Sequence, residues 1–146
     1  MNALRKVPRR RASAFFAAAV IAVSAYSSLA IAKDIKVTLS GNQEVPPVTT
    51  AAAGTGTISV SADKSVSGSV TTTGVAGTMA HIHDGAPGKN GPVVIPLSKS
   101  GDGTWSVPAG AKLTDAQYKS FEAGNLYVNV HSAAHGGGEL RGQIKP

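Results

Sequence analysis

The sequence contains no cysteine, which excludes disulfides, thiolate metal sites and cysteine nucleophiles. Acidic residues are absent from the first 32 positions, and no apolar run after Lys33 is long enough to cross a bilayer. The 8 acidic residues are scattered singly, so no paired-carboxylate site can be proposed. No serine, histidine and aspartate spacing supports a hydrolase triad either. These absences leave few routes to enzymatic chemistry.

The first 32 residues have the layout of a secretory signal peptide. Five basic residues lie between Arg5 and Arg11, a mostly apolar segment covers residues 14–29, and Ala30-Ile31-Ala32 is a small-x-small cleavage site. An uncleaved membrane anchor is the alternative, but the early cleavage site and the serines near the end of the segment argue against it. We therefore expect a periplasmic or secreted protein that begins near Lys33 and has no membrane attachment after cleavage.

The charge of the expected mature chain, residues 33–146, differs from that of the whole sequence. Five of the 14 basic residues and none of the 8 acidic ones lie before Lys33, which leaves nine basic residues and a net charge near +1. A balance this close to neutral gives no reason to expect nucleic acid as a partner. The remaining length suits one domain, whose stability without disulfides depends on its own core, with a bound metal as a further support.

Short alternating apolar runs separated by turn residues dominate the mature chain and predict an all-β fold. We expect an antiparallel Greek-key β-sandwich or barrel of about eight strands. Asp63-Lys64 is predicted to form a hairpin turn between the second and third of them. The expected strands cover residues 35–39, 56–61, 65–73, 78–83, 93–97, 104–107, 126–131 and 139–144.

One short connecting helix is predicted to interrupt the strands. Thr114 is a good N-cap residue and Gln117 lies three positions later, which is the pattern of a capping box. Gly124 provides the C-terminal stop. Tyr118 and Phe121 are three apart and can face the core together. We expect this helix to close one end of the sheet structure.

All four histidines fall in two clusters. His81 and His83 are separated by one residue, and His131 and His135 by three. Neutral imidazole is the commonest protein ligand for zinc and copper. An i, i+2 pair on a strand directs both rings to one face. The second pair would share a side only on a helix, whereas Gly136-Gly137 favours a loop there, which makes His135 the less certain ligand.

Alternation along three strands places polar side chains on one face of each. If the three strands share a sheet, these faces coincide, and lysine, the usual solvating residue, is absent from the set. The members of this polar face are Met79, His81, His83, Tyr127, Asn129, His131, Glu139, Arg141 and Gln143.

Two interpretations of the polar face stay open. In the first, it is a metal site whose ligands come from His81, His83, His131 and His135. The side chains around these ligands would be Met79, Asn129, Glu139 and Arg141. A thioether is a soft ligand, so Met79 favours copper over zinc. In the second, the histidines are neutral members of a hydrogen-bonded network that fixes the strand register.

Five motifs occur along the mature chain, at residues 39–47, 80–94, 113–114, 124–131 and 138–143. Together they resemble the CHRD domain, which is named from its repeats in chordin and also occurs singly in exported bacterial proteins. The resemblance implies a β-rich exported domain and supplies no defined activity. Within the first motif, Glu44 precedes Pro46-Pro47, and we interpret this segment as a strand end rather than a ligand-facing loop.

The His81-Ile82-His83 segment and the Gly-rich stretch after it also resemble the metal strand of copper-zinc superoxide dismutases, which are Greek-key sandwiches. In that family the ligand histidines lie on the outer face of the barrel, as inferred here. This chain has no cysteine pair, and no bridging histidine or zinc-binding aspartate can be placed. The resemblance therefore favours copper and not dismutase activity.

Three functions follow from these observations. The first is an exported metal-binding protein, for copper before zinc, that acts in metal handling. The alternative is a structural or protein-interaction module with an extracytoplasmic protein partner, in which the histidines belong to the register-fixing network. A metal-dependent redox enzyme is the least favoured, because no further catalytic group is visible.

Overall fold

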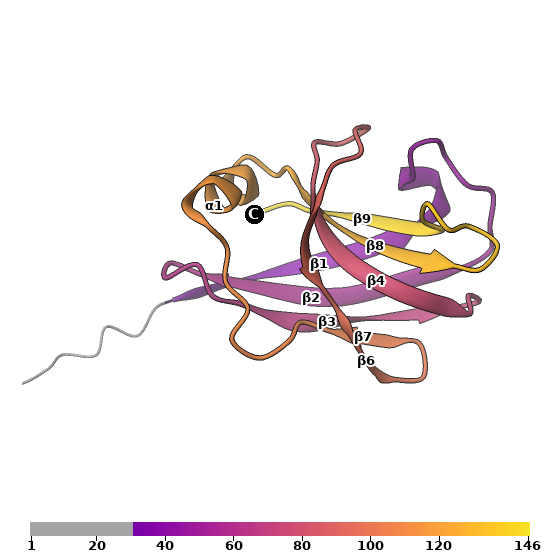
Figure 1. Cartoon of the computed structure of the whole chain (residues 1–146), viewed down its shortest axis with the longest axis horizontal. Coiled ribbons are helices and arrows are strands. Elements are labelled where there is room, and N and C mark those ends of the chain that lie inside the picture. The colour runs from indigo at the N-terminus through magenta and orange to yellow at the C-terminus, as the bar shows by residue number, and fades with distance from the viewer. Residues whose placement is uncertain (1–30) are drawn as a thin grey trace, which may run out of the picture.

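A computed structural model describes residues 31–146, which form nine strands, one 3-10 helix and one α-helix (Figure 1). The predicted signal peptide, residues 1–32, lies outside the described residues apart from Ile31 and Ala32. The all-β class with one short helix is confirmed. The strands are β1 (Ala32–Ser40), β2 (Ala53–Ser61), β3 (Val66–Thr73), β4 (Gly77–Asp84), β5 (Val93–Pro96), β6 (Ser98–Gly101), β7 (Thr104–Ser106), β8 (Leu126–Ser132) and β9 (Leu140–Ile144); the helices are η1 (Gly41–Gln43) and α1 (Asp115–Glu122).

All nine strands belong to one antiparallel sheet with the order β5-β4-β8-β9-β1-β2-β3-β7-β6. The two strands at its ends, β5 and β6, are consecutive in the chain and are joined through Leu97. The backbone N–H of Leu97 donates to the Ala80 carbonyl of β4, at 2.9 Å. The sheet therefore curls into a nearly closed barrel, which resolves the choice between sandwich and barrel.

The expected strands all have counterparts in the structure, and β6 is the one that the sequence pattern missed. All four of its residues are exposed, and it pairs with β7 alone. A strand that buries no side chain carries no alternation of apolar and polar residues. Backbone pairing at the end of the sheet, not side-chain burial, forms this strand.

The turn predicted at Asp63-Lys64 joins β2 to β3 as an antiparallel hairpin. The backbone N–H of Lys64 donates to the Ser61 carbonyl, at 2.8 Å. Lys64 has a φ of 70°, in the left-handed region that tight hairpin turns require. The turn thus aligns the two strands from Val60 opposite Val66 onward.

The helix α1 begins and ends as predicted. Both halves of the capping box between Thr114 and Gln117 are present, and Gly124 follows the helix with a φ of 72°. Phe121 is buried, and its ring centroid lies 5.8 Å from that of Tyr118. The cap contributes about 1 kcal/mol to the helix. In Figure 1, α1 lies at one end of the barrel.

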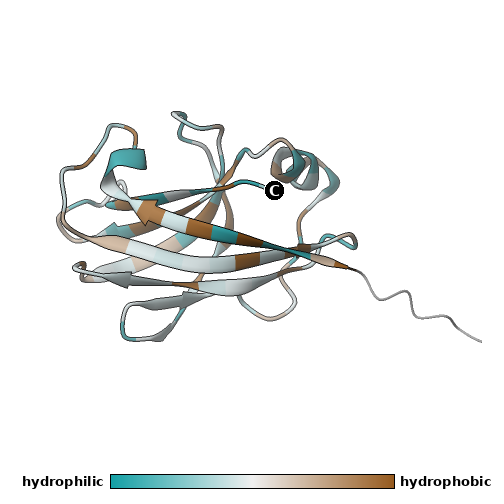
Figure 2. Ribbon diagram, turned by 180° about the vertical axis from the view of Figure 1, so that it is seen from behind, coloured by the Kyte–Doolittle hydropathy of each residue, from teal (hydrophilic) through white to brown (hydrophobic). Residues whose placement is uncertain are grey.

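Apolar side chains from alternate positions of the strands fill the barrel interior. Figure 2 shows hydrophobic and hydrophilic positions alternating along the strands. Residues such as Val37, Ile58, Val70 and Val128 are at most 1% exposed, so removing a few methylenes from any of them would leave a cavity. No helix among the described residues is long and apolar enough to span a membrane.

The strands β4, β8 and β9 are neighbours, so their polar faces coincide as the alternation predicted. This polar face lies on the outside of the barrel, yet most of its side chains are buried. The cover comes from two loops, residues 41–52 and 85–92, which bond to the face at several points. The polar face is therefore a buried layer between the outside of the sheet and these loops.

Candidate metal centre

Three histidines of the polar face come together on two adjacent strands. His81 and His83 lie on β4, and His131 lies on β8. The strand register places His131 opposite Met79 and His83 opposite Tyr127, so the three imidazoles occupy one corner of the face. One nitrogen from each ring lies within 4.8 Å of the other two. Three convergent imidazoles are a ligand set for zinc or copper.

The spacing between His81 and His131 is close to that of two ligands of one metal. Nδ1 of His81 and Nε2 of His131 are 3.1 Å apart. Two nitrogens bound to one tetrahedral zinc at the usual bond lengths would be separated by roughly 3.3 Å. The two rings also meet edge to face, with centroids 5.0 Å apart. Without a metal these two nitrogens are hydrogen-bonded to each other, so a metal ion bound by both would replace the proton between them.

Backbone carbonyls select the tautomers of two of the rings. Nδ1 of His83 lies 2.9 Å from the Gly91 carbonyl, and Nδ1 of His131 lies 3.0 Å from the Gly136 carbonyl. A carbonyl oxygen only accepts, so each Nδ1 carries the proton and donates it. Nε2 of each neutral ring is then an unprotonated donor of a lone pair. Histidine ligands of metals are held in this way in most metal sites.

Nε2 of His83 is buried and has no hydrogen-bond partner anywhere within residues 31–146. A buried polar atom without a partner costs free energy, and such atoms are rare in folded proteins. A nitrogen of the same ring lies within 4.8 Å of a nitrogen of each of the other two histidines. A metal ion bound at the group would supply the missing partner.

The electrostatic environment keeps His81 and His83 neutral. Burial lowers the pKa of both imidazoles, because water no longer solvates their charged forms. The hydrogen bond to the Gly91 carbonyl raises the pKa of His83 in part, while His131 lowers the pKa of both rings and Arg141 that of His83. A neutral imidazole is the form that binds a metal, so the site favours the ligand state over the protonated state.

The loop 85–92 holds the Gly91 carbonyl in place against His83. At Gly91 a Cβ atom would lie 1.7 Å from the Asp84 carbonyl oxygen, so only glycine fits. The guanidinium of Arg141 donates to the carbonyls of Lys89 and Ala86, at 2.9 and 3.0 Å. These bonds tie the loop to β9 and thereby position the acceptor of the His83 proton.

Asn129 and Glu139 take part in a hydrogen-bonded network beside the histidines. Nδ2 of Asn129 donates to the carboxylate of Glu44 and to the Leu140 carbonyl. Glu139 accepts from Ser132 and from Thr50, and the Ser132 bond is the main reason that its pKa is lowered. Both side chains therefore have protein partners of their own, which agrees with the interpretation of a register-fixing network for this part of the face.

Two of the predicted site residues are not members of the histidine group. His135 is in the turn after β8, where its backbone N–H donates to Ser132, and the structure does not bring its ring to the other three histidines. Met79 faces the site across from His131, but 46% of its surface is exposed. The structure thus groups His81, His83 and His131.

Glu44 bonds to the polar face although its sequence context indicated a strand end, and Tyr127 makes contacts on the face that alternation alone does not specify. The interpretation of Glu44 as a strand end is wrong: β1 ends at Ser40, and Glu44 follows η1 and turns inward to become 5% exposed. Only an inward-turning loop explains this burial, and no local pattern shows it. Tyr127 was placed on the face by alternation, but its contacts with His83 and Arg141 depend on tertiary packing.

Comparisons with known proteins identify one family. The model of the CHRD domain matches residues 35–144, which extend from β1 to the end of β9. No curated protein and no solved structure matches the chain. The match includes both strands of the histidine group and both loops that cover the polar face.

Proposed function

The chain belongs to the CHRD-domain family, and we propose that this member uses its β-barrel to bind a transition-metal ion through His81, His83 and His131. The protein would be exported, as the first 32 residues predict, and would act in metal handling in the periplasm or outside the cell. No substrate and no chemical turnover are part of the proposal.

The buried Nε2 of His83 is the observation that carries this proposal. It lacks a partner within the described residues, while the other nitrogen of the same ring is bound to Gly91. A network that served only to fix the register would satisfy both nitrogens, as it satisfies Asn129. His131 is oriented in the same manner by Gly136, which supports a common purpose for the two rings.

Copper is the first candidate for the ion and zinc the second. Three imidazoles bind both metals, and for a given site of this type Cu²⁺ binds more tightly than Zn²⁺. Met79 adds a thioether at the exposed side of the group, opposite His131. A thioether is a soft ligand that suits Cu⁺, so this side chain favours copper as the ion that is handled.

A structural or protein-interaction module is the second candidate function. The observation in its favour is the completeness of the network around Arg141: this side chain is 1% exposed and donates to two carbonyls and to Gln143. Such a network holds the loop 85–92 on the barrel whether or not a metal is present. In that case an extracytoplasmic protein would be the partner.

Calorimetric titration of the purified protein with Cu²⁺ and with Zn²⁺ tests the metal site. We expect one ion per chain and a metal-dependent rise in melting temperature. His83→Ala should lower the affinity by roughly 100-fold or more, because one of three ligands is lost. His135→Ala is the matched control and should bind as the wild type does.

Three results would contradict the proposal. One is absence of stoichiometric binding by either metal. Another is equal loss of affinity in His83→Ala and His135→Ala, which would indicate nonspecific binding by imidazole. The third is a His83→Ala protein that binds metal normally and is merely less stable, which would favour the structural module.

A further inference from the structure

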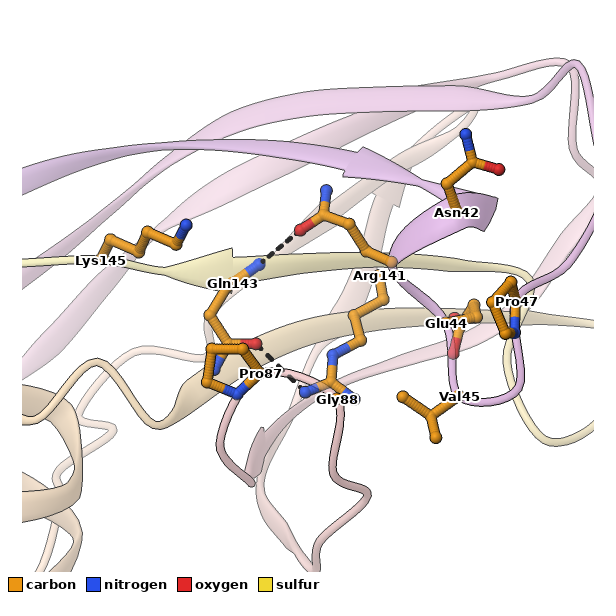
Figure 3. Close-up of a pocket in the computed structure, with 10 residues that line it drawn as sticks. Asn42, Glu44, Val45, Pro47, Pro87, Gly88, Arg141, Gln143 and Lys145 are labelled. Carbon is orange, nitrogen blue, oxygen red and sulfur yellow. Dashed lines mark hydrogen bonds between the residues drawn. The ribbon is translucent and has the colours of Figure 1, made fainter.

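A pocket lies beside β9, between the segment 42–47 and the tip of the loop 85–92. It has a volume of about 430 Å³, within the range of small-molecule sites. None of its ten lining residues is a histidine. Figure 3 shows the side chains of Arg141, Gln143 and Lys145 along β9, with the segment Asn42–Pro47 and the tip of the loop at Pro87 and Gly88 around them.

The β9 side of this pocket carries positive charge. Arg141, Gln143 and Lys145 are alternate residues, so they share one face of the strand end. Arg141 is buried, but no carboxylate forms an ion pair with it among residues 31–146. Its bonds go to neutral acceptors, namely two loop carbonyls and the Gln143 amide, so its charge is not cancelled by contact. Lys145 adds an exposed ammonium at the rim.

Glu44 is the one acid that lines the pocket. Desolvation by burial raises its pKa to about 7, although the hydrogen bond from Asn129 and the charge of Arg141 lower it in part. Near neutral pH this carboxyl is therefore only partly ionised. Together with Arg141 and Lys145 it leaves the pocket with net positive charge.

Apolar side chains form part of the remaining wall. Val45 and Pro47 lie on one loop and Pro87 on the other, and both loops line the same hollow (Figure 3). Asn90 of the second loop donates through Nδ2 to the Val45 carbonyl, at 2.8 Å, which fixes the two walls to each other. The pocket thus has a cationic side and an apolar side, and its two loops are joined by a hydrogen bond.

We propose that this pocket binds a small organic anion whose carboxylate is attached to an apolar group. The carboxylate would lie toward Lys145 in the field of Arg141, and the apolar group would lie against Val45, Pro47 and Pro87. This binding site is separate from the metal site and does not depend on it. Charge complementarity selects the anion, and the proline-rich walls select the apolar part.

N-acetyl-L-leucine and its neutral amide, N-acetyl-L-leucinamide, are matched probes that share the apolar group and differ in charge. We expect the acid to shift the backbone NMR signals of residues 42–47 and of Gly88 in a saturable manner, and the amide to bind at least about 5-fold more weakly. Inorganic phosphate, an anion without an apolar part, should also bind more weakly than the acid. These comparisons separate charge from apolar contact.

Charge reversal at the rim locates the site. Lys145→Glu should weaken binding of the acid by about 5-fold or more, whereas Lys119→Glu, an exposed lysine of α1 outside the pocket, should leave it unchanged. Asn42→Asp, also at the rim and exposed, should weaken it independently. Equal binding of acid and amide would overturn the proposal, as would absence of shifts at these residues up to about 10 mM probe or insensitivity to both rim substitutions.

Discussion

The imidazole of His83 and the phenol ring of Tyr127 are stacked, with an angle of 8° between their planes and 4.9 Å between their centroids. The guanidinium of Arg141 lies over the same Tyr127 ring, 3.6 Å from its centroid. Because β8 lies between β4 and β9, the tyrosine stands between a metal-ligand candidate and a buried cation. The orientation of His83 therefore depends on a ring in the neighbouring strand as well as on the Gly91 carbonyl.

Tyr127→Leu should lower the metal affinity by roughly 10-fold, because His83 loses the surface that fixes its ring plane. Tyr127→Phe keeps the ring and removes only the hydroxyl that accepts from the Gly91 backbone N–H, so its affinity should stay near that of the wild type. Calorimetric titration with Cu²⁺ compares the two. Equal affinities for the leucine and phenylalanine variants would show that stacking does not orient His83.

Arg141→Met should destabilise the protein by about 3 kcal/mol, because the carbonyls of Lys89 and Ala86 lose their donors. Hydrogen exchange should become faster in the loop 85–92 before it does in the core strands. Arg141→Lys keeps a charge but not the planar fork, so an intermediate loss is expected. Lys119→Met, at an exposed position, is the control and should change the free energy of unfolding by less than about 0.5 kcal/mol.

Glu44→Gln should stabilise the protein above pH 8, by on the order of 2 kcal/mol. The pKa of Glu44 is about 7 in the folded protein against an ordinary value of 4.5. The folded state therefore binds the proton more tightly, and the stability gained from this group is full below about pH 4.5 and is lost as the pH rises through 7. Glutamine keeps the oxygen that accepts from Asn129 without the buried charge. Urea unfolding at pH 5 and pH 8 measures this, and an equal difference at both values would contradict it.

Metal affinity should be nearly constant from pH 8 down to about 6.5 and should fall below that value. The lowered pKa values of His81 and His83 mean that protons compete for these rings only under more acidic conditions than is usual. By the same linkage, the metal-free protein should lose stability below about pH 6.5, where the unfolded chain takes up protons first. Glu44→Gln is the background for this measurement, since Glu44 acts in the opposite direction over the same range. A decline in affinity that begins above pH 7 would contradict the expectation.

Most of the strands and the helix could be predicted because their signals are local. Val37 and Leu39 alternate with polar neighbours, and Thr114 precedes Gln117 by the capping-box spacing. The strand β6 could not be predicted, because Ser98–Gly101 buries nothing and is held by backbone pairing with β7. The local pattern of residues could not predict closure into a barrel either, because the sheet pairs strands that are far apart in the chain.

The sequence placed His81, His83 and His131 on one face, because side chains alternate along a strand and the two segments have the same polarity pattern. The distances among the rings depended on the register that sets Met79 opposite His131. The tautomers depended on the carbonyls of Gly91 and Gly136, which belong to loops and leave no mark in the pattern of side chains.

Local periodicity and capping were enough to determine the all-β class, the helix and a polar face rich in histidine, because these properties depend on neighbours within a few residues. Tertiary structure decided that this outer face is buried, that Glu44 turns inward to Asn129, and that Arg141 holds the covering loop. The physical reason is that polar and apolar residues alternate along a strand in the same way whether its polar face is exposed to solvent or covered by loops. The loops 41–52 and 85–92 cover this face, and burial lowers the pKa values of His81 and His83.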